Sequence, residues 1–237
     1  MSLIKLDNMK KKIGYIIFVR FRSKRLPGKA MIEINNFPTL YYVIERAKKI
    51  RPRNKIIVAT TNLKSDEKII DFCKKNKILY FRGPNKDVYL RAALCCKKFK
   101  LNSFLRICAD RIFFDFNLAS KMVKIFKKNK FDIVTNSLVK SYPRGTSIEI
   151  ISYKKLKETY KLLKDKNDKE HIFNYFYKNK KNFRIKNILS NYSNKITKIN
   201  LSLDTKSDFI KIEKCLKSMI YSPIVETKKI ISYYSKK

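Results

Sequence analysis

Short apolar runs alternate along the chain with longer segments in which apolar residues recur at helical spacing. The short runs predict buried β-strands at 13–19, 55–59, 78–81, 103–108 and 132–135. The segments between them predict amphipathic helices at 39–50, 65–76, 86–99 and 117–128. Repeated β-α-β units of this length predict an α/β fold, with a mostly parallel sheet between two layers of helices.

The rhythm changes after residue 136. Strands are expected there at 147–151, 183–188 and 198–203, and helices at 154–163, 168–177 (capped by Asp168) and 207–218. The sequence contains no internal repeat and no low-complexity linker. We therefore expect one domain over 1–237, with an elaboration at about 138–195.

The composition is strongly basic but permits a folded core. Hydrophobic residues make up 44% of the 237 residues, and 57 Lys and Arg against 19 Asp and Glu give a formal net charge of +38. Such a charge suggests nucleic acid or an anionic membrane as a partner. However, the lysines are spread over every segment, which indicates compositional drift at exposed positions. The rare Arg, Gly and Pro residues are therefore the more informative positions.

Cysteine and histidine usage argues against a zinc site. The 5 cysteines form no CxxC pair, and His171 is the single histidine. No apolar run approaches the roughly 18 residues that span a bilayer, and the N-terminus lacks the apolar region of a signal peptide. We therefore expect a cytoplasmic protein with reduced thiols and no membrane span.

A cluster of cations follows the first predicted strand. We call residues 20–29 the basic loop; its cations are Arg20, Arg22, Lys24, Arg25 and Lys29. Loops at the carboxyl ends of strands bind ligands in open α/β sheets. Arginine offers forked hydrogen bonds to phosphate, and lysine offers a mobile point charge. Three arginines within six residues favour phosphate binding over a solvated turn, although the GxxxxGK[ST] pattern of a P-loop is absent.

Two acidic residues come directly after apolar strand patterns. Asp110 follows the predicted strand 103–108, and Asp204 follows 198–203. If both lie at one edge of the sheet, they can hold Mg²⁺ against phosphate oxygens. Alternatively, Asp204 caps the helix that begins near residue 207. The spacing leaves both interpretations open.

These motifs resemble, in the same order, those of the cytidylyltransferases that activate acidic sugars. The family includes CMP-Kdo synthetases, acylneuraminate cytidylyltransferases and spore-coat SpsF-type proteins. The resemblance begins in the basic loop and covers about residues 13–215. It continues through the segments 57–61, 80–83, 106–110, 142–145, 170–171 and 203–205.

The resemblance implies a Rossmann-like nucleotide-diphospho-sugar transferase fold and a reaction. In that reaction CMP passes from CTP to the hydroxyl of an acidic keto sugar, pyrophosphate leaves, and the product serves surface-glycan synthesis. The residues implied to bind the nucleotide are Arg20, Arg22, Ser23, Arg25, Lys29, Arg82, Gly83 and Arg91. Asp110 and Asp204 are implied as Mg²⁺ ligands that act with Arg20, Arg25 and Lys29 in catalysis.

The resemblance also implies an acceptor site and a homodimer. The residues implied to face the sugar are Arg144, Gly145, Glu149 and His171. For His171 the alternative is a helix-face histidine held by a neighbouring carbonyl. The dimer is expected to form through the elaboration at about 138–195.

The chain departs from the family pattern at three positions. Arg22 stands where a small residue is usual, Ala109 replaces a glycine, and Arg111 follows Asp110. Arg22 is expected either to add a phosphate contact or to crowd the loop. Arg111 is expected to pair with Asp110 and weaken metal binding. Asp115 is a separate case: we interpret it as a helix cap rather than as a second metal ligand.

Two other functions compete with the cytidylyltransferase hypothesis. A nucleotidylyltransferase acting on a sugar phosphate would keep the fold but need more cations around the acceptor. A non-enzymatic nucleic-acid-binding protein would use the +38 charge, but no RNA-recognition aromatic motif or helix-turn-helix pattern is present.

Overall fold

Seven strands form one twisted sheet through the middle of the molecule. The computed structural model describes residues 12–128, 130–219 and 224–236, so the expectation about an N-terminal signal peptide falls largely outside it. The strands are β1 (Ile13–Phe18), β4 (Ile56–Thr61), β5 (Leu79–Gly83), β6 (Ser103–Cys108), β7 (Ile133–Thr135), β8 (Glu149–Ser152) and β9 (Ile185–Asn187). Their order is β5-β4-β1-β6-β8-β7-β9. Only β8 runs antiparallel to its neighbours, which confirms the mostly parallel mixed sheet.

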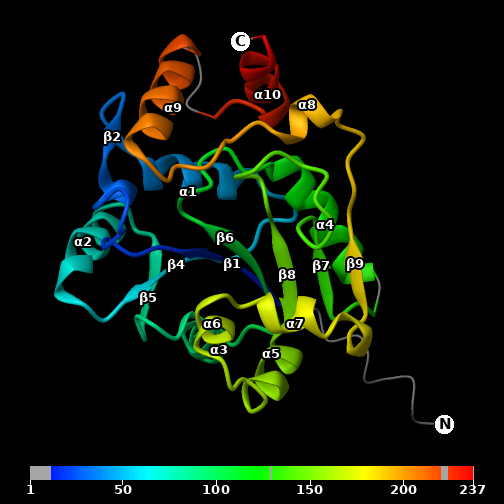
Figure 1. Cartoon of the computed structure of the whole chain (residues 1–237). Helices are drawn as coiled ribbons and strands as arrows, with labels where there is room; N and C mark the ends of the chain where they lie inside the picture. The colour runs from blue at the N-terminus through cyan, green and yellow to red at the C-terminus, as the bar shows by residue number, and fades with distance from the viewer. Residues whose placement is uncertain (1–11, 129, 220–223, 237) are drawn as a thin grey trace.

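Helices cover both faces of the sheet. The first face carries α1 (Thr39–Lys49), α2 (Glu67–Lys75), α4 (Phe116–Lys128), α9 (Lys206–Ser218) and α10 (Thr227–Ser235). The second carries α3 (Val88–Lys98), α5 (Tyr153–Tyr160), α6 (Lys166–Glu170) and α7 (Asn174–Lys178). In Figure 1 most helices of the first face lie above the sheet, and those of the second lie below it.

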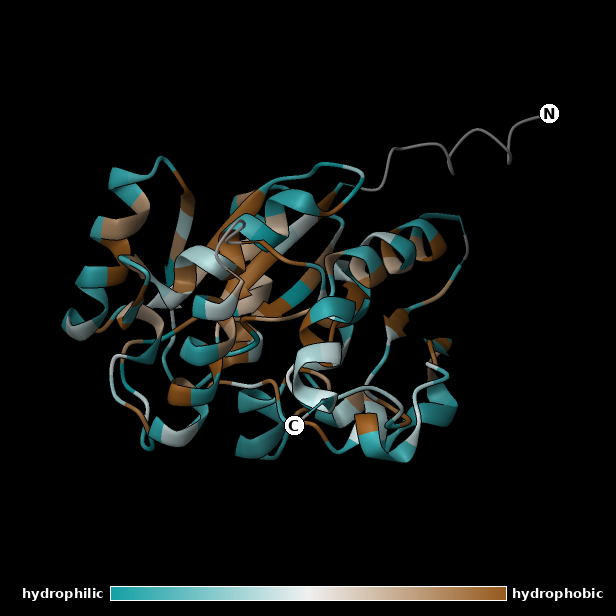
Figure 2. Cartoon of the chain, turned by 90° about the horizontal axis from the view of Figure 1, so that it is seen from above, coloured by the Kyte–Doolittle hydropathy of each residue, from teal (hydrophilic) through white to brown (hydrophobic). Residues whose placement is uncertain are grey.

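Side-chain alternation along the strands explains the two layers. Within β1, Tyr15 and Ile17 pack into the core of the first face, whereas Ile16 and Phe18 pack into the second. A strand that is apolar on both sides must be covered on both sides, as parallel sheets usually are. Figure 2 shows the hydrophobic strands inside and hydrophilic residues along the outer helices. In the part of the chain that the structure describes, no helix is long and apolar enough to cross a bilayer.

Three expected elements differ in the structure. The segment 198–203 is not a strand, because its backbone bonds to loops: Leu201 N donates to Arg144 O at 2.8 Å and Leu203 N to Asp110 O at 2.8 Å. The expected helix 168–177 is two short helices, α6 and α7. Asp165 caps α6, while Asp168 is buried and accepts hydrogen bonds from α7. The expected strand 183–188 shortens to β9.

Several short elements were not predicted. They are the hairpin of β2 (Glu33–Ile34) and β3 (Phe37–Pro38), the 3₁₀ segments η1 (Lys29–Met31), η2 (Lys64–Asp66) and η3 (Lys180–Asn182), and the helices α8 (Asn194–Thr197) and α10. Of these, η1 and η2 are important for the site, because they lie at the end and at the base of the basic loop.

A buried carboxylate anchors the basic loop. Gly28 adopts a left-handed φ of 69° and donates its N–H to Phe21 O at 2.9 Å, which closes the loop on itself. Phe21 N in turn donates to Asp66 Oδ1 at 2.9 Å. The other oxygen of Asp66 accepts hydrogen bonds from the Thr60 hydroxyl, the Thr61 hydroxyl and Thr61 N. The loop is therefore fixed to the end of β4.

The environment of Asp66 stabilises its charged form. Burial alone would raise the pKa of this carboxyl, but the hydrogen bonds from Thr60, Thr61 and Phe21 outweigh burial and lower the pKa. A carboxyl whose pKa is lower in the folded state stabilises the fold above its unfolded value of about 3.9. That contribution disappears as the pH falls through the folded-state pKa.

We expect Asp66→Asn to lower the free energy of unfolding by about 3 kcal/mol at pH 7, since five groups donate to this carboxylate and an amide replaces one accepting oxygen by a donor. The difference from the wild type should stay constant down to about pH 5 and narrow below about pH 4. Urea denaturation at pH 7 and pH 3.5 measures both effects. Asp71→Asn, on the exposed face of α2, is the matched control and should change stability little. If the difference in unfolding free energy between the wild type and Asp66→Asn does not narrow in acid, Asp66 is not the ionised anchor described here.

Candidate nucleotide-binding site

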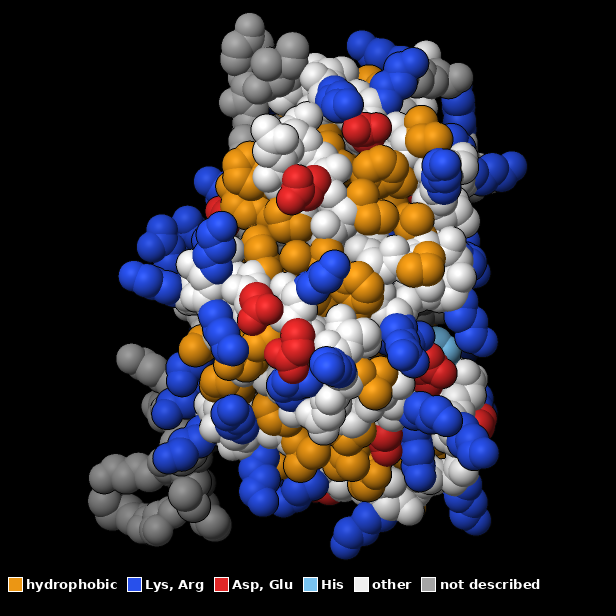
Figure 3. Space-filling model, turned by 90° about the vertical axis from the view of Figure 1, so that its left-hand side faces the viewer, with side chains coloured by type: hydrophobic (Ala, Val, Ile, Leu, Met, Phe, Trp, Pro, Cys, Tyr) orange, Lys and Arg blue, Asp and Glu red, His pale blue; other side chains and the backbone are white. Residues whose placement is uncertain are grey.

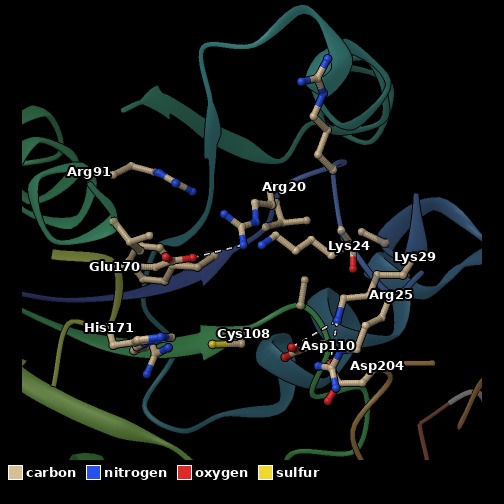
Figure 4. Close-up of a pocket in the computed structure, with 18 residues that line it drawn as sticks. Arg20, Lys24, Arg25, Lys29, Arg91, Cys108, Asp110, Glu170, His171 and Asp204 are labelled. Carbon is tan, nitrogen blue, oxygen red and sulfur yellow. Dashed lines mark hydrogen bonds and ion pairs between the residues drawn. The ribbon is translucent and has the colours of Figure 1, made fainter. Parts of the chain in front are cut away.

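A pocket of about 410 Å³ opens beside the carboxyl ends of β1 and β6. The residues of the basic loop that line it are Arg20, Arg22, Ser23, Lys24, Arg25 and Lys29. The opposite walls contribute Val88, Arg91, Arg106, Cys108, Asp110, Glu170, His171 and Asp204. In Figure 4, Arg25, Lys29, Asp110 and Asp204 gather on one side of the view, and Arg91, Glu170 and His171 on the other.

Asp204 is the most heavily paired carboxylate of the pocket. Its Oδ1 lies 2.8 Å from Arg25 Nη2 and 3.1 Å from Lys29 Nζ, and its Oδ2 lies 2.8 Å from Arg144 Nη2. Burial opposes the charge, but Lys29, Arg25 and Arg144 lower the pKa of Asp204 overall. Asp204 is thus an ionised group at the meeting point of three segments.

The helix-cap interpretation of Asp204 is wrong. The Thr205 hydroxyl caps α9 by accepting from Asp208 N, and the Asp208 carboxylate accepts from Thr205 N, which completes a capping box. Asp204 is left to face the pocket. By contrast, the cap interpretation of Asp115 is confirmed, because its Oδ1 accepts from Asn117 N and Leu118 N at the start of α4.

Lys29 joins the two acidic residues of the pocket. Its Nζ lies 3.4 Å from Asp110 Oδ2, 3.1 Å from Asp204 Oδ1 and 2.7 Å from Leu203 O. Hence Asp110 and Asp204 direct oxygens toward one point. Among the described residues there is no group of three or more metal-ligating side chains. Two carboxylates completed by phosphate and water are nevertheless what Mg²⁺ uses in nucleotide sites, so the donors fit this ion.

At the other end of the pocket, the basic loop meets the segment between α6 and α7. Arg20 Nη2 lies 3.3 Å from Glu170 Oε1, and both side chains are half-exposed. Next to Glu170, His171 lies just beyond the end of α6, is exposed and lines the pocket. The short break between the two helices therefore presents both residues to the cavity.

Arg91 is a buried cation in the pocket wall. Its guanidinium donates to Pro84 O and Asn85 O, both at 2.9 Å, and burial lowers its pKa to about 10. Gly83 lies against it, since a Cβ at Gly83 would meet Arg91 Cγ at 2.8 Å. Arg82, which was also expected to bind the nucleotide, forms an ion pair with Glu67. Neither Arg82 nor Gly83 is among the lining residues.

Beneath the pocket floor, Glu149 pairs with two arginines. Its carboxylate lies 3.3 Å from Arg106 Nη1 and 3.3 Å from Arg111 Nη1, and Arg111 also donates to Ser147 O. Glu149 is buried and does not line the cavity. Arg111 is therefore held by Glu149 and Ser147, and its ion pair is not with Asp110.

Gly145 is placed beside the pocket by a close backbone approach. Its φ is 91°, and a Cβ there would lie 2.4 Å from Ser202 N. Only glycine lets the turn after Pro143 pass this close to the segment that carries Asp204. The neighbouring Arg144 reaches the carboxylate of Asp204, as described above.

Sequence reasoning missed four residues of this arrangement as site residues: Asp66, Arg106, Cys108 and Glu170. A signal for two of them was present. Arg106 and Cys108 precede Asp110 at intervals of two, which places them on one face of β6. The partners of Asp66 and Glu170 come from distant segments, and no local pattern marks them.

On the side of the molecule shown in Figure 3, the charge is dispersed. Figure 3 shows Lys and Arg over the whole of one side of the molecule, interrupted by hydrophobic and a few acidic side chains. This distribution agrees with drift at exposed positions rather than with one continuous basic stripe.

The chain is similar to known proteins in sequence as well as in structure. The sequence model of a family described as "Cytidylyltransferase" matches residues 15–236. An uncharacterized protein of Methanocaldococcus jannaschii is 33% identical over 198 residues, covering 84% of this chain and 80% of that protein. The spore coat polysaccharide biosynthesis protein SpsF of Bacillus subtilis is 22% identical over 226 residues, covering 93% and 92%.

Two solved structures are similar to the whole fold. A cytidylyltransferase from Leptospira borgpetersenii serovar Hardjo-bovis superposes with a TM-score of 0.90 at 26% identity, covering 95% of this chain and 94% of that one. A CMP:2-keto-3-deoxy-manno-octonic acid synthetase complexed with CTP gives a TM-score of 0.68 at 13% identity, covering 88% and 100%. The family match extends over nearly the whole chain, and the chain therefore belongs to the cytidylyltransferase family, enzymes that transfer a nucleotidyl group from CTP.

Proposed function

We propose that this enzyme transfers CMP from CTP to the hydroxyl of an acidic keto sugar, releasing pyrophosphate, and that the product serves surface-glycan synthesis. One observation carries the proposal: the cations of the basic loop and the carboxylates Asp110 and Asp204 meet in one pocket. Cations there match a triphosphate, and the paired carboxylates match the metal ion that accompanies it. The SpsF protein of B. subtilis, a spore coat polysaccharide biosynthesis protein, supports the glycan context.

The basic loop is assigned to the triphosphate. Arg20, Arg22, Ser23, Arg25 and Lys29 all line the pocket, and Arg91 lies on the side away from Asp204 and is assigned to the nucleoside end. Nucleotidyl transfer relies mainly on positioning and charge neutralisation rather than on a covalent intermediate. Arg25 and Lys29 are assigned to stabilising the leaving pyrophosphate.

Asp110 and Asp204 are assigned to Mg²⁺. When bound, this ion supplies charge neutralisation at the α-phosphate and a lower pKa for the attacking hydroxyl. The residues of the chain then have two tasks: they hold the triphosphate in line, and they orient the acceptor hydroxyl.

Arg144 and His171 are assigned to the acceptor. Arg144 is largely exposed and ends beside Asp204, where a sugar carboxylate near the reacting hydroxyl would lie. His171 lines the pocket from the α6–α7 break. Gly145 and Glu149 act indirectly in this proposal: Gly145 lets the Asp204 segment pass, and Glu149 holds Arg106 and Arg111.

A phosphorylated acceptor is the second candidate. Lys24 lines the pocket without an ion pair to any described residue and is not among the residues assigned to the triphosphate, so this cation is available for another phosphate. A 4-diphosphocytidyl-2C-methyl-D-erythritol synthase from Anaerococcus prevotii shares the fold, with a TM-score of 0.59 at 20% identity. The acceptor assay below separates the two classes.

Calorimetric titration with CTP, UTP, GTP and ATP in the presence of Mg²⁺ tests the nucleotide site. We expect selective CTP binding, and a loss of about tenfold to 100-fold in affinity for Arg25→Ala, since a charge-assisted hydrogen bond to phosphate contributes about 1.5–3 kcal/mol. Arg53→Ala removes the same charge from an exposed position outside the pocket and should bind CTP as the wild type does. Equal, weak and strongly salt-dependent binding of all four nucleotides would contradict the site.

Pyrophosphate release from CTP tests the acceptor and the metal ligands together. We expect turnover with 2-keto-3-deoxy sugar acids and none with sugar phosphates. Asp110→Asn should lower kcat/KM about 100-fold, a typical cost of removing one group that stabilises transition-state charge. Glu213→Gln changes a partly exposed residue of α9 that does not line the pocket, and it should leave kcat/KM unchanged. Turnover only with phosphorylated acceptors would favour the second candidate.

We also propose a homodimer that uses the surface at 138–195. Val139 and Leu189 are exposed apolar residues in this region, 53% and 59% accessible, and Asn187 bonds the backbone of Val139 close to Leu189. Sedimentation equilibrium should give twice the chain mass, and Leu189→Glu should give the monomer mass. A monomeric wild type would remove this part of the proposal.

A further inference from the structure

Lys29 has no donor left for a phosphate in this structure. A lysine ammonium carries three N–H donors. Three acceptors surround Lys29 Nζ: Asp110 Oδ2, Asp204 Oδ1 and Leu203 O, at 3.4, 3.1 and 2.7 Å. Its side chain is only 16% exposed. Figure 4 shows the contacts with both carboxylates as dashed lines.

We propose that Lys29 occupies the cation position between Asp110 and Asp204 until nucleotide binds, and that it prevents a metal ion from binding there alone. The triphosphate then withdraws the ammonium from the carboxylates, and the metal ion enters together with the nucleotide. The inference rests on the proposed function, because it takes the pair Asp110 and Asp204 as the metal ligands.

Electrostatics makes the two cations alternatives. A divalent ion bound by these oxygens at about 2.0–2.1 Å would lie close to an ammonium that stays in contact with them. Repulsion between two cations at such a separation is strong where the surroundings are partly buried, as they are here. Without nucleotide, a displaced Lys29 would exchange two charged acceptors and a carbonyl for uncharged water. With a triphosphate present, phosphate oxygens replace them.

Lys29 is distinguished from the other cations of the pocket by its contacts. Arg25 and Arg144 each pair with Asp204, and neither has an ion pair with Asp110 in the described part of the chain. Lys24 lies in the same loop and lines the same pocket without an ion pair to a described carboxylate. A general effect of positive charge would therefore be shared by Lys24 and Lys29. Direct occupation of the metal position belongs to Lys29 alone.

Binding of Mn²⁺ to the full chain without nucleotide tests the proposal, with the free ion measured by electron paramagnetic resonance. We expect Lys29→Gln and Lys29→Met to bind Mn²⁺ at least about tenfold more tightly than the wild type, since a cation in direct contact is removed. Lys24→Gln is the matched control, and its Mn²⁺ affinity should stay within about threefold of the wild-type value. The amide of Lys29→Gln still donates to the carboxylates, so this variant keeps part of the local structure.

A second measurement uses the wild type and does not depend on a variant folding. Adding CTP should raise the affinity of the wild type for Mn²⁺ at least about 100-fold. The increase that CTP causes should be much smaller in Lys29→Gln. Equal Mn²⁺ affinities of Lys29→Gln and Lys24→Gln would overturn the inference. So would a wild type whose Mn²⁺ affinity is unaffected by bound CTP.

The failure of this inference and the failure of the proposed function are distinguishable. If CTP binds selectively while Lys29→Gln leaves the nucleotide-free Mn²⁺ affinity unchanged, the inference is wrong and the nucleotide site stands. If Lys29→Gln tightens Mn²⁺ binding in a protein that does not bind CTP, Lys29 occupies a cation position and the proposed function is wrong.

Discussion

The carboxylate of Asp204 is surrounded by Arg25, Lys29 and Arg144, which come from the basic loop and from the turn after Pro143. Its side chain is only 9% exposed, so its charge is tolerated because these cations compensate for lost hydration. The same contacts place the 198–205 segment against the basic loop. The geometry of the pocket therefore depends on one ionised group, and the supporting elements serve to deliver the cations to it. Asp66 does this for the basic loop by fixing the backbone of Phe21 at the end of β4.

Most cations of the pocket are paired within the protein. Arg20 is held by Glu170, Arg91 by two carbonyls, Arg106 by Glu149 and Lys29 by both catalytic-site candidates, Asp110 and Asp204. Pairing limits the repulsion among them and keeps them oriented without ligand. A triphosphate bound as proposed would have to offer these cations more than their internal partners do. Selectivity for a highly charged ligand follows, because a weak anion cannot compete with a carboxylate already in contact.

The regular α/β part of the fold was predictable because each element has its own local signal. β6 (Ser103–Cys108) was predicted with its observed bounds, since six residues buried on both faces leave no helical alternative of that length.

Prediction was poorer after residue 136, where structure depends on distant partners. The 198–203 segment has a strand pattern, but it finds loop carbonyls instead of a strand edge. The helix expected at 168–177 breaks because Asp168 is drawn inward by Asn174 and Lys178. The basic loop and both pocket aspartates could be found from sequence because each follows an apolar run with a strand pattern, although the run before Asp204 is not a strand in the structure. The anchoring role of Asp66 could not, since its partners are set by the tertiary fold.

The family departure at Arg111 shows how a local pattern is reinterpreted by tertiary context. Beside Asp110 in the sequence, this arginine was expected to neutralise a metal ligand. Instead, β8 runs antiparallel next to β6 and brings Glu149 opposite Arg106, within reach of Arg111 as well. One buried carboxylate thus holds two arginines and leaves a net positive charge below the pocket floor. Asp110 is left with a single cation partner among the described residues, Lys29. Because a lysine ammonium is carried on a flexible stem and a triphosphate in the pocket would attract it, Asp110 is the carboxylate that ligand binding would free most completely. The replacement of the usual residue by Arg111 is therefore compatible with a metal ligand at position 110, provided that Glu149 remains in place.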